Sequence, residues 1–153
     1  MQKSEDGGRR AEVGGRRTEV GDRRTVMQIN SAKDLDVYKQ AFDLAMEIFQ
    51  LSKRWPVEEK FSLTDQIRRS SRSVCANLRE SWAKRRYLAH FVNKLTDCDG
   101  ENSETATWLD FAFSCGYLSS TEYKKLSQSY KQIGGMLGAV LRNPKPFLLK
   151  TEE

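Results

Sequence analysis

The sequence predicts an all-α fold, an antiparallel up-and-down four-helix bundle with a disordered N-terminal tail. Apolar residues recur at helical spacing through most of the chain after residue 27, which favours helices. There is no run of alternating β-branched residues and there are only three prolines, so strands have no signal. The 153 residues, 38% of them hydrophobic, suffice for one domain with a modest core. We divide the chain into a tail, 1–26, and a bundle domain, 27–153.

The tail carries a seven-residue repeat whose units begin at Gly7, Gly14 and Gly21. Each unit holds an arginine pair and one valine, and the first two also begin with a glycine pair. This is too little apolar surface to offset the entropy of ordering. Two interpretations remain open: an arginine–glycine arm that contacts RNA phosphates, or translated repetitive DNA upstream of a true start at Met27. Peptides from residues 1–26 in natively expressed protein would exclude the second.

The first two helices are predicted from their apolar spacing and from the residues at their ends. The first runs from Leu35 to Lys53, and Pro56 closes it because proline cannot continue a helix interior. The second begins at Thr64, which we expect to act as its N-cap, and either ends at about Arg86 or bends there and continues.

The third and fourth helices have clearer boundary signals. The third covers Tyr87 to Cys115, and Gly116 is typical of the position just after a helix end. Residues 119–122, Ser-Ser-Thr-Glu, have the form of a capping box and open a fourth helix that reaches about Leu141. Short connections between long helices favour an antiparallel bundle. Three glycines of the fourth helix indicate close approach of another backbone: Gly134, Gly135 and Gly138.

Three stripes of different chemistry run along the second predicted helix. At about 100° per residue, one face is the core seam, formed by Ile67, Ser71, Val74, Cys75, Leu78 and Trp82. An adjacent strip about 40° wide carries Arg68, Arg72, Arg79 and Arg86. The opposite flank carries Gln66, Ser70, Ser73, Asn77 and Ser81. This pattern is typical of a bundle helix with interactions on both sides of its core face.

Charge is divided sharply between neighbouring segments. Residues 64–94 hold eight basic side chains and two acidic ones, whereas residues 95–123 hold six acidic side chains and no Lys or Arg. A basic strip that faces solvent attracts phosphate, but one that faces an acidic helix is already neutralised, within the bundle or across a subunit interface. Both interpretations stay open at this stage. The cluster Lys84, Arg85 and Arg86 lies at a helix end, where we expect it to stay free.

Motifs for catalysis, cofactors and metals are missing from the sequence. The single histidine, His90, has Tyr87 three residues before it, so the Glu-x-x-His element of di-iron bundles is absent. Cys75, Cys98 and Cys115 stand singly, which favours buried free thiols in a reducing, cytoplasmic setting. No apolar run is long enough to span a membrane. We expect no enzymatic activity, no cofactor, no metal, no small-molecule substrate and no membrane partner.

A series of short motifs, in order along the chain, carries a family resemblance. They are Asp34-Leu35-x-Val37-Tyr38-x-x-Ala41, Leu63-Thr64-x-Gln66-Ile67-Arg68-Arg69, Ser73-Val74-x-x-Asn77-Leu78-x-Glu80, Phe91, Gly100-x-x-x-Glu104, Leu109-x-x-Ala112 and Gly116-Tyr117-Leu118. From about 35 to 141 the chain resembles the four-helix-bundle proteins encoded in intervening sequences of bacterial 23S ribosomal RNA. That family is similar to the accessory protein of diversity-generating retroelements.

Two departures from the family pattern stand in the second and third helices. Arg79 and Ser81 stand where the family usually shows alanine and glycine in Asn-Ile-Ala-Glu-Gly, and Ala106 replaces the second acid of a Glu-x-Glu pair. The resemblance implies a homo-oligomer, a ring of five bundles, that acts near structured RNA or near a reverse transcriptase and its nucleic acid. It implies no enzymatic activity.

The sequence hypothesis is a cytoplasmic, non-catalytic bundle that self-associates and binds structured RNA through a basic face. The residues expected to contact phosphate are Arg68, Arg72, Arg79, Lys84, Arg85 and Arg86. Polar contacts between helices or subunits are expected from Gln66, Ser73, Asn77 and Glu104, the last with an arginine of the second helix. The alternative is a scaffold that binds no nucleic acid and whose arginines meet Asp97, Asp99, Glu101 and Glu104.

Overall fold

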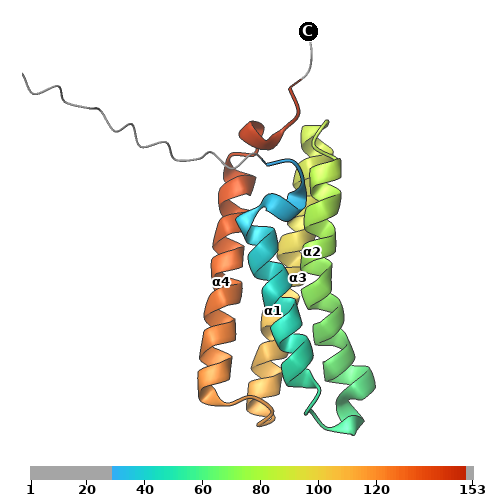
Figure 1. The fold of residues 1–153 in the computed structure, drawn as a ribbon, viewed down its shortest axis with the longest axis vertical. Helices are drawn as coiled ribbons and strands as arrows, with labels where there is room; N and C mark the ends of the chain where they lie inside the picture. The colour runs from blue at the N-terminus through green and yellow to red at the C-terminus, as the bar shows by residue number, and fades with distance from the viewer. Residues whose placement is uncertain (1–28, 151–153) are drawn as a thin grey trace, which may run out of the picture.

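The computed structural model describes residues 29–150, and these form four helices packed antiparallel in the order of the sequence (Figure 1). The helices are α1, Asp36–Ser52; α2, Asp65–Ala83; α3, Leu88–Ser114; and α4, Ser120–Arg142. The predicted fold class is therefore confirmed, and the helix ends lie within a few residues of the predicted ones. The interpretation of the tail, residues 1–26, lies outside the described residues.

Short helical segments flank the bundle helices. The element η1, Ala32–Asp34, precedes α1, and η4, Lys145–Phe147, follows α4 at the same end of the bundle (Figure 1). At the other end, a 3-10 turn, η2 (Val57–Glu59), and a π-helical turn, η3 (Lys60–Thr64), lead directly into α2.

The core lies along the shared axis of the four helices, and the most extensive contact is between α2 and α3. Its largest fully buried side chains include Ile48, Ile67, Phe91, Leu109, Tyr130 and Leu137. The apolar seam predicted for α2 is buried at Ile67, Val74 and Leu78, as its helical spacing requires. Polar residues also enter this interior, because Ser70 and Thr105 are both 0% exposed.

The connection between α3 and α4 is built as predicted. Gly116 has φ of +79°, and the amide of Tyr117 donates to the Ala112 carbonyl at 2.9 Å while the Gly116 amide donates to Phe113. This is the Schellman pattern that satisfies the last carbonyls of a helix. At the start of α4, Ser119 and Glu122 complete a capping box.

The start and end of α2 differ from the prediction. Thr64 has helical backbone angles and makes no side-chain cap, since the chain already turns helically from Val57 onward. The Glu59 carboxylate instead accepts from the Leu63 amide at 3.3 Å. The helix stops at Ala83, so Arg86 lies in the following turn and does not extend the strip of arginines along the helix.

Two smaller expectations were wrong. Cys115 is exposed, because it follows the last turn of α3, whereas Cys75 and Cys98 are buried. Burial raises the pKa of the Cys75 thiol to about 11. The glycines of α4 meet no neighbouring backbone: a Cβ at Gly134 would lie 3.4 Å from the side-chain amide of Asn102, and one at Gly135 would meet nothing.

Candidate nucleic-acid interface on helix α2

The arginines expected to contact phosphate lie on the flank of α2 that faces α1. We call Arg68, Arg72 and Arg79 the arginine strip. The guanidinium carbons of Arg68 and Arg72 lie 4.8 Å and 5.6 Å from the ring centre of Phe49 on α1. Arg68 also donates from Nε to Ser52 Oγ at 2.8 Å. These contacts hold the charged groups at the surface of the α1–α2 groove without neutralising them.

No carboxylate among residues 29–150 lies within ion-pairing distance of the arginine strip. Arg72 and Arg79 are exposed. Arg72 also lines a surface hollow of about 480 Å³, together with Asp65, Arg68, Arg69, Ser73 and Ala76. The strip therefore presents positive charge to solvent, where it can attract an anion.

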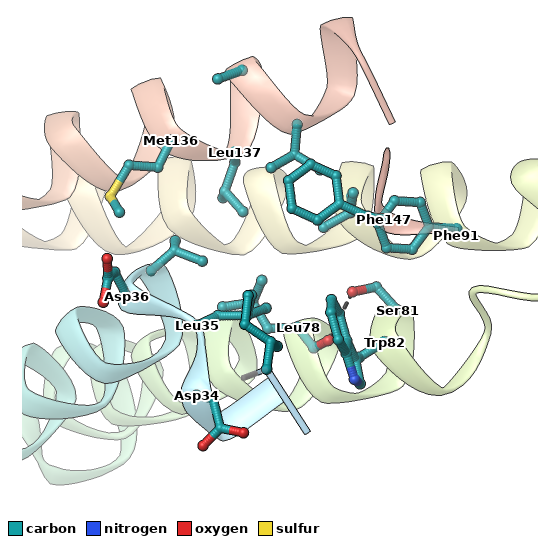
Figure 2. Close-up of a pocket in the computed structure, with 15 residues that line it drawn as sticks. Asp34, Leu35, Asp36, Leu78, Ser81, Trp82, Phe91, Met136, Leu137 and Phe147 are labelled. Carbon is teal, nitrogen blue, oxygen red and sulfur yellow. Dashed lines mark hydrogen bonds between the residues drawn. The ribbon is translucent and has the colours of Figure 1, made fainter. Parts of the chain in front are cut away.

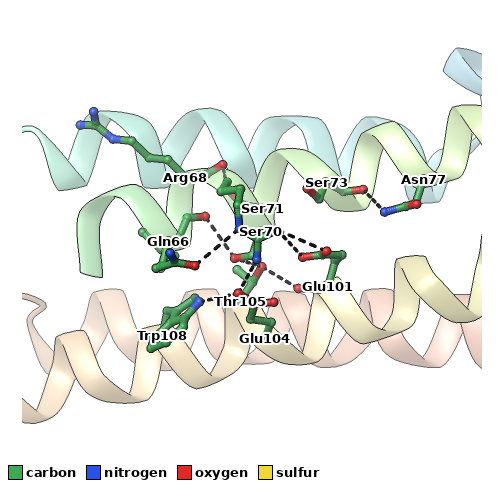
Figure 3. A network of polar contacts seen from close by, with 12 residues as sticks. Gln66, Arg68, Ser70, Ser71, Ser73, Asn77, Glu101, Glu104, Thr105 and Trp108 are labelled. Atoms are coloured by element: carbon green, nitrogen blue, oxygen red, sulfur yellow. Dashed lines mark hydrogen bonds and ion pairs between the residues drawn. The ribbon is translucent and has the colours of Figure 1, made fainter. Parts of the chain in front are cut away.

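The other flank of α2 pairs with α3, and its arginine is Arg69. This side chain forms ion pairs with Glu101, at 3.3 Å, and with Glu104, whose carboxylate also accepts from Trp108 Nε1 at 3.1 Å (Figure 3). These contacts lower the pKa of the Glu104 carboxyl, and Arg69 is the main cause. Figure 3 shows Arg68 extending away from this network, so consecutive arginines serve different flanks.

A second link between α2 and α3 is made by Lys94, which lies 2.7 Å from the Glu80 carboxylate and 3.7 Å from that of Asp97. The acidic segment is thus neutralised in part by Arg69 and Lys94, and not by the arginine strip. Asp97 and Glu80 remain exposed at this edge.

The polar residues expected to bridge helices are placed differently from one another. Glu104 reaches α2, but Asn77 donates to the Ser73 carbonyl within α2, and Gln66 accepts from Arg69 at 3.5 Å in the same helix. The buried bridge that the sequence did not single out is between Ser70 and Thr105, whose hydroxyl oxygens lie 2.8 Å apart. The position of Ser70 on the polar flank of the helical wheel was the one sequence feature that indicated such a contact.

The cluster of Lys84, Arg85 and Arg86 forms the turn between α2 and α3. Lys84 and Arg86 are exposed. Arg85 lies with its guanidinium 3.6 Å from the Trp82 ring centre and donates to the Trp82 carbonyl. Its own carbonyl accepts from the Leu149 amide, so the C-terminal segment is attached to this turn.

The family of the chain follows from a comparison with protein-family models. The model of the 23S rRNA-intervening sequence protein family matches residues 33–139, which include all four helices up to the last turn of α4. The chain belongs to this family. The family has no established function.

A solved structure from Bacteroides thetaiotaomicron VPI-5482 is similar to this member of the 23S rRNA-intervening sequence family. It is described as a protein of unknown function from the S23 ribosomal protein family. The two are 29% identical, the match covers 70% of this chain and 96% of the other, and the TM-score is 0.63. The comparison with curated proteins gives no match.

The described part of this family member also holds an apolar hollow of about 460 Å³ at the end of the bundle where α1 starts (Figure 2). Trp82, Phe91, Leu137 and Phe147 are among its walls. No sequence signal pointed to this hollow, because its apolar wall residues have the spacing of ordinary core positions. Asp34 of η1 also lines the hollow, and its carboxylate accepts hydrogen bonds from the backbone amides of residues 30 and 31.

Residues 29–150 contain neither a candidate membrane span nor a candidate metal-binding cluster. No helix there is both long and apolar enough to cross a membrane. No group of three or more His, Cys, Asp or Glu side chains in that range is arranged to hold a metal ion.

Proposed function

We propose that this protein is a non-catalytic, self-associating bundle that binds structured RNA through the arginine strip of α2. The observation that carries the proposal is the placement of Arg72 and Arg79: both face solvent, and no carboxylate of residues 29–150 neutralises them. Guanidinium groups bind phosphate oxygens in a bidentate way, which favours Arg over Lys at such surfaces.

Two neighbouring features support the same reading. Phe49 holds Arg68 and Arg72 in the groove, so less side-chain entropy is lost when they meet a phosphate. The exposed Lys84 and Arg86 continue the positive surface beyond the end of α2. Arg85 contributes less to this surface, because its guanidinium is stacked on Trp82. The description of the family, which refers to 23S ribosomal RNA, agrees with an RNA partner.

The proposal includes a closed homo-oligomer, which the family resemblance gives as a ring of five, in a reducing cytoplasm. The thiols of Cys75 and Cys98 are free and buried, which suits that compartment. A role beside a reverse transcriptase belongs to the same proposal, since its nucleic acid would meet the same arginines.

Salt-dependent binding tests the RNA part of the proposal. The full chain is titrated into a labelled hairpin of ribosomal RNA at several salt concentrations, and fluorescence anisotropy reports the affinity. Each phosphate contact steepens the log–log slope by about 0.7 to 0.9. We expect a slope that corresponds to several contacts. No binding even at low salt would contradict RNA recognition.

The second candidate is a scaffold without nucleic acid, favoured by the ion pairs that Arg69 and Lys94 form with acids of the α2–α3 surface. In the scaffold, Arg72 and Arg79 would form ion pairs with acidic side chains of a neighbouring subunit. Light scattering of an Arg72→Glu/Arg79→Glu variant separates the two: an unchanged mass agrees with the RNA proposal, and a fall to the subunit mass agrees with the scaffold.

A further inference from the structure

Among residues 29–150, the most exposed large apolar side chains lie at the end of the bundle where α2 begins. Phe61 is 82% exposed, and Val57, one turn earlier, is 81% exposed. Both belong to the turns η2 and η3, which lead the chain from α1 into α2. Two large apolar side chains displayed this fully within one short segment form an exposed patch that a second surface can cover. Lys60 lies over the Phe61 ring at 5.2 Å, so the projecting group carries a cation beside its aromatic face.

A hollow with the complementary chemistry lies on the same end of the molecule. Its volume is about 260 Å³, and Leu63, Trp108, Phe111 and Cys115 are among its walls. The Trp108 and Phe111 rings lie 5.9 Å apart and tilted, and Phe111 is 55% exposed. We call this hollow the aromatic hollow. Glu59 also lines it, and its carboxylate accepts from the Ser62 hydroxyl, the Leu63 amide and the Tyr117 hydroxyl.

Phe61 does not line the aromatic hollow of its own chain and remains exposed to solvent. Phe61 and the aromatic hollow are neighbours at this end of the bundle, because Glu59, Ser62 and Leu63, which flank Phe61 in the sequence, line the hollow. A contact in which Phe61 of one copy enters the hollow of another copy therefore uses this same end of both molecules. The charges agree with this contact: Lys60 has no carboxylate partner in residues 29–150, and the carboxylate of Glu59 lies among the residues that line the hollow.

We propose that Phe61 of one copy of this chain inserts into the aromatic hollow of the next copy, with Lys60 beside the Glu59 carboxylate. The inference rests on the proposed self-association and assigns its contact surface. Phe61 supplies the anchor, and Trp108 and Phe111 supply the aromatic walls on which it packs.

Light scattering of the full chain and of single variants tests the assignment. Phe61→Ser removes the anchor, Phe111→Lys places a cation in the hollow wall, and Phe42→Ser is the control, since Phe42 on α1 is also an exposed phenylalanine, at 49%. We expect the first two to weaken association by about tenfold or more and to give the subunit mass of 17.6 kDa when dilute, with no change for the control. Each site is exposed, so the variants should fold.

The outcomes separate the inference from the proposal on which it rests. If the unmodified chain is a monomer at every concentration, self-association fails and the inference fails with it. If the unmodified chain assembles and Phe61→Ser assembles equally well, only the contact assigned here is overturned. Equal loss in the Phe42→Ser control would also overturn it, since the effect would not belong to this surface.

Thiol labelling gives a second readout at the hollow itself. Cys115 is exposed in the single chain, while Cys75 and Cys98 are buried and burial raises their thiol pKa values, so Cys115 is the thiol that an alkylating reagent meets first. We expect slow labelling of Cys115 in the assembled protein and faster labelling in Phe61→Ser. Equal rates in the two would contradict insertion at this hollow.

Discussion

At the scale of single residues, one buried polar contact between α2 and α3 is the hydroxyl pair of Ser70 and Thr105. Thr105 Oγ1 lies 2.8 Å from Ser70 Oγ and 2.9 Å from the Glu101 carbonyl, and the Ser70 hydroxyl lies 3.3 Å from the Ile67 carbonyl. Both side chains are 0% exposed, so water cannot replace a lost partner.

We expect Thr105→Val to lower the free energy of unfolding by about 1 to 3 kcal/mol, because it leaves the Ser70 hydroxyl without that contact. Denaturant unfolding measures the change. Thr107→Val is the matched control: Thr107 on α3 also contacts the carbonyl four residues earlier, at 3.1 Å, but it is exposed. A similar loss in both variants would contradict a special role for the buried pair.

The ion pair of Arg69 and Glu104 predicts a dependence of stability on pH. The pKa of Glu104 lies below its ordinary 4.5 in the folded protein, mainly through Arg69. A lowered carboxyl pKa stabilises the fold above 4.5, and that contribution is lost as the pH falls through the folded-state value. Arg69→Gln should therefore unfold more easily than the unmodified chain at neutral pH and equally easily in acid. A difference that persists unchanged in acid would contradict this cause.

At the scale of elements, Gly100 inside α3 and Gly116 just after its end allow a matched comparison of two Gly→Ala substitutions. Neither Gly100 nor Gly116 has an atom within 4 Å of an added Cβ, but Gly116 has φ of +79° and Gly100 lies inside the helix. We expect Gly116→Ala to lower the free energy of unfolding by about 1 to 2 kcal/mol, because the left-handed conformation strains alanine. Gly100→Ala should raise it by about 0.5 to 1 kcal/mol. Thermal or denaturant unfolding of both reports the signs, and equal signs would contradict the assignment.

Much of each element could be predicted from the sequence because the signals are local. The apolar period, the capping box at Ser119 and the glycine at Gly116 each act within one or two turns. The start of α2 could not be predicted in this way, because the chain after Pro56 already turns helically. In that turn the side chain of Glu59, and not that of Thr64, accepts from a free backbone amide, that of Leu63. A helical wheel also placed Arg68 and Arg79 on one strip, but it could not show which carboxylate meets which arginine.

At the scale of the whole molecule, the two flanks of α2 have different roles. The flank toward α3 is neutralised by Arg69 with Glu101 and Glu104, whereas the flank toward α1 keeps its positive charge at Arg72 and Arg79. The composition of residues 64–94 and 95–123 shows that the two segments carry opposite charge. Only the packing of the helices shows that these charges pair on the flank of α2 toward α3 and not on the flank toward α1. The exposed Phe61 and the hollow behind it have no sequence signal, since they depend on which turn faces solvent.

The measurement that tests the RNA interface most directly compares two pairs of charge-removing variants in the anisotropy titration. Arg72→Gln/Arg79→Gln removes two members of the arginine strip, and Lys124→Gln/Lys131→Gln removes two exposed lysines of α4 as the control. We expect the first pair to weaken binding and to reduce the log–log salt slope by about 1.4 to 1.8, with no change for the control. Equal slopes for both pairs would show that the arginine strip does not bind the RNA.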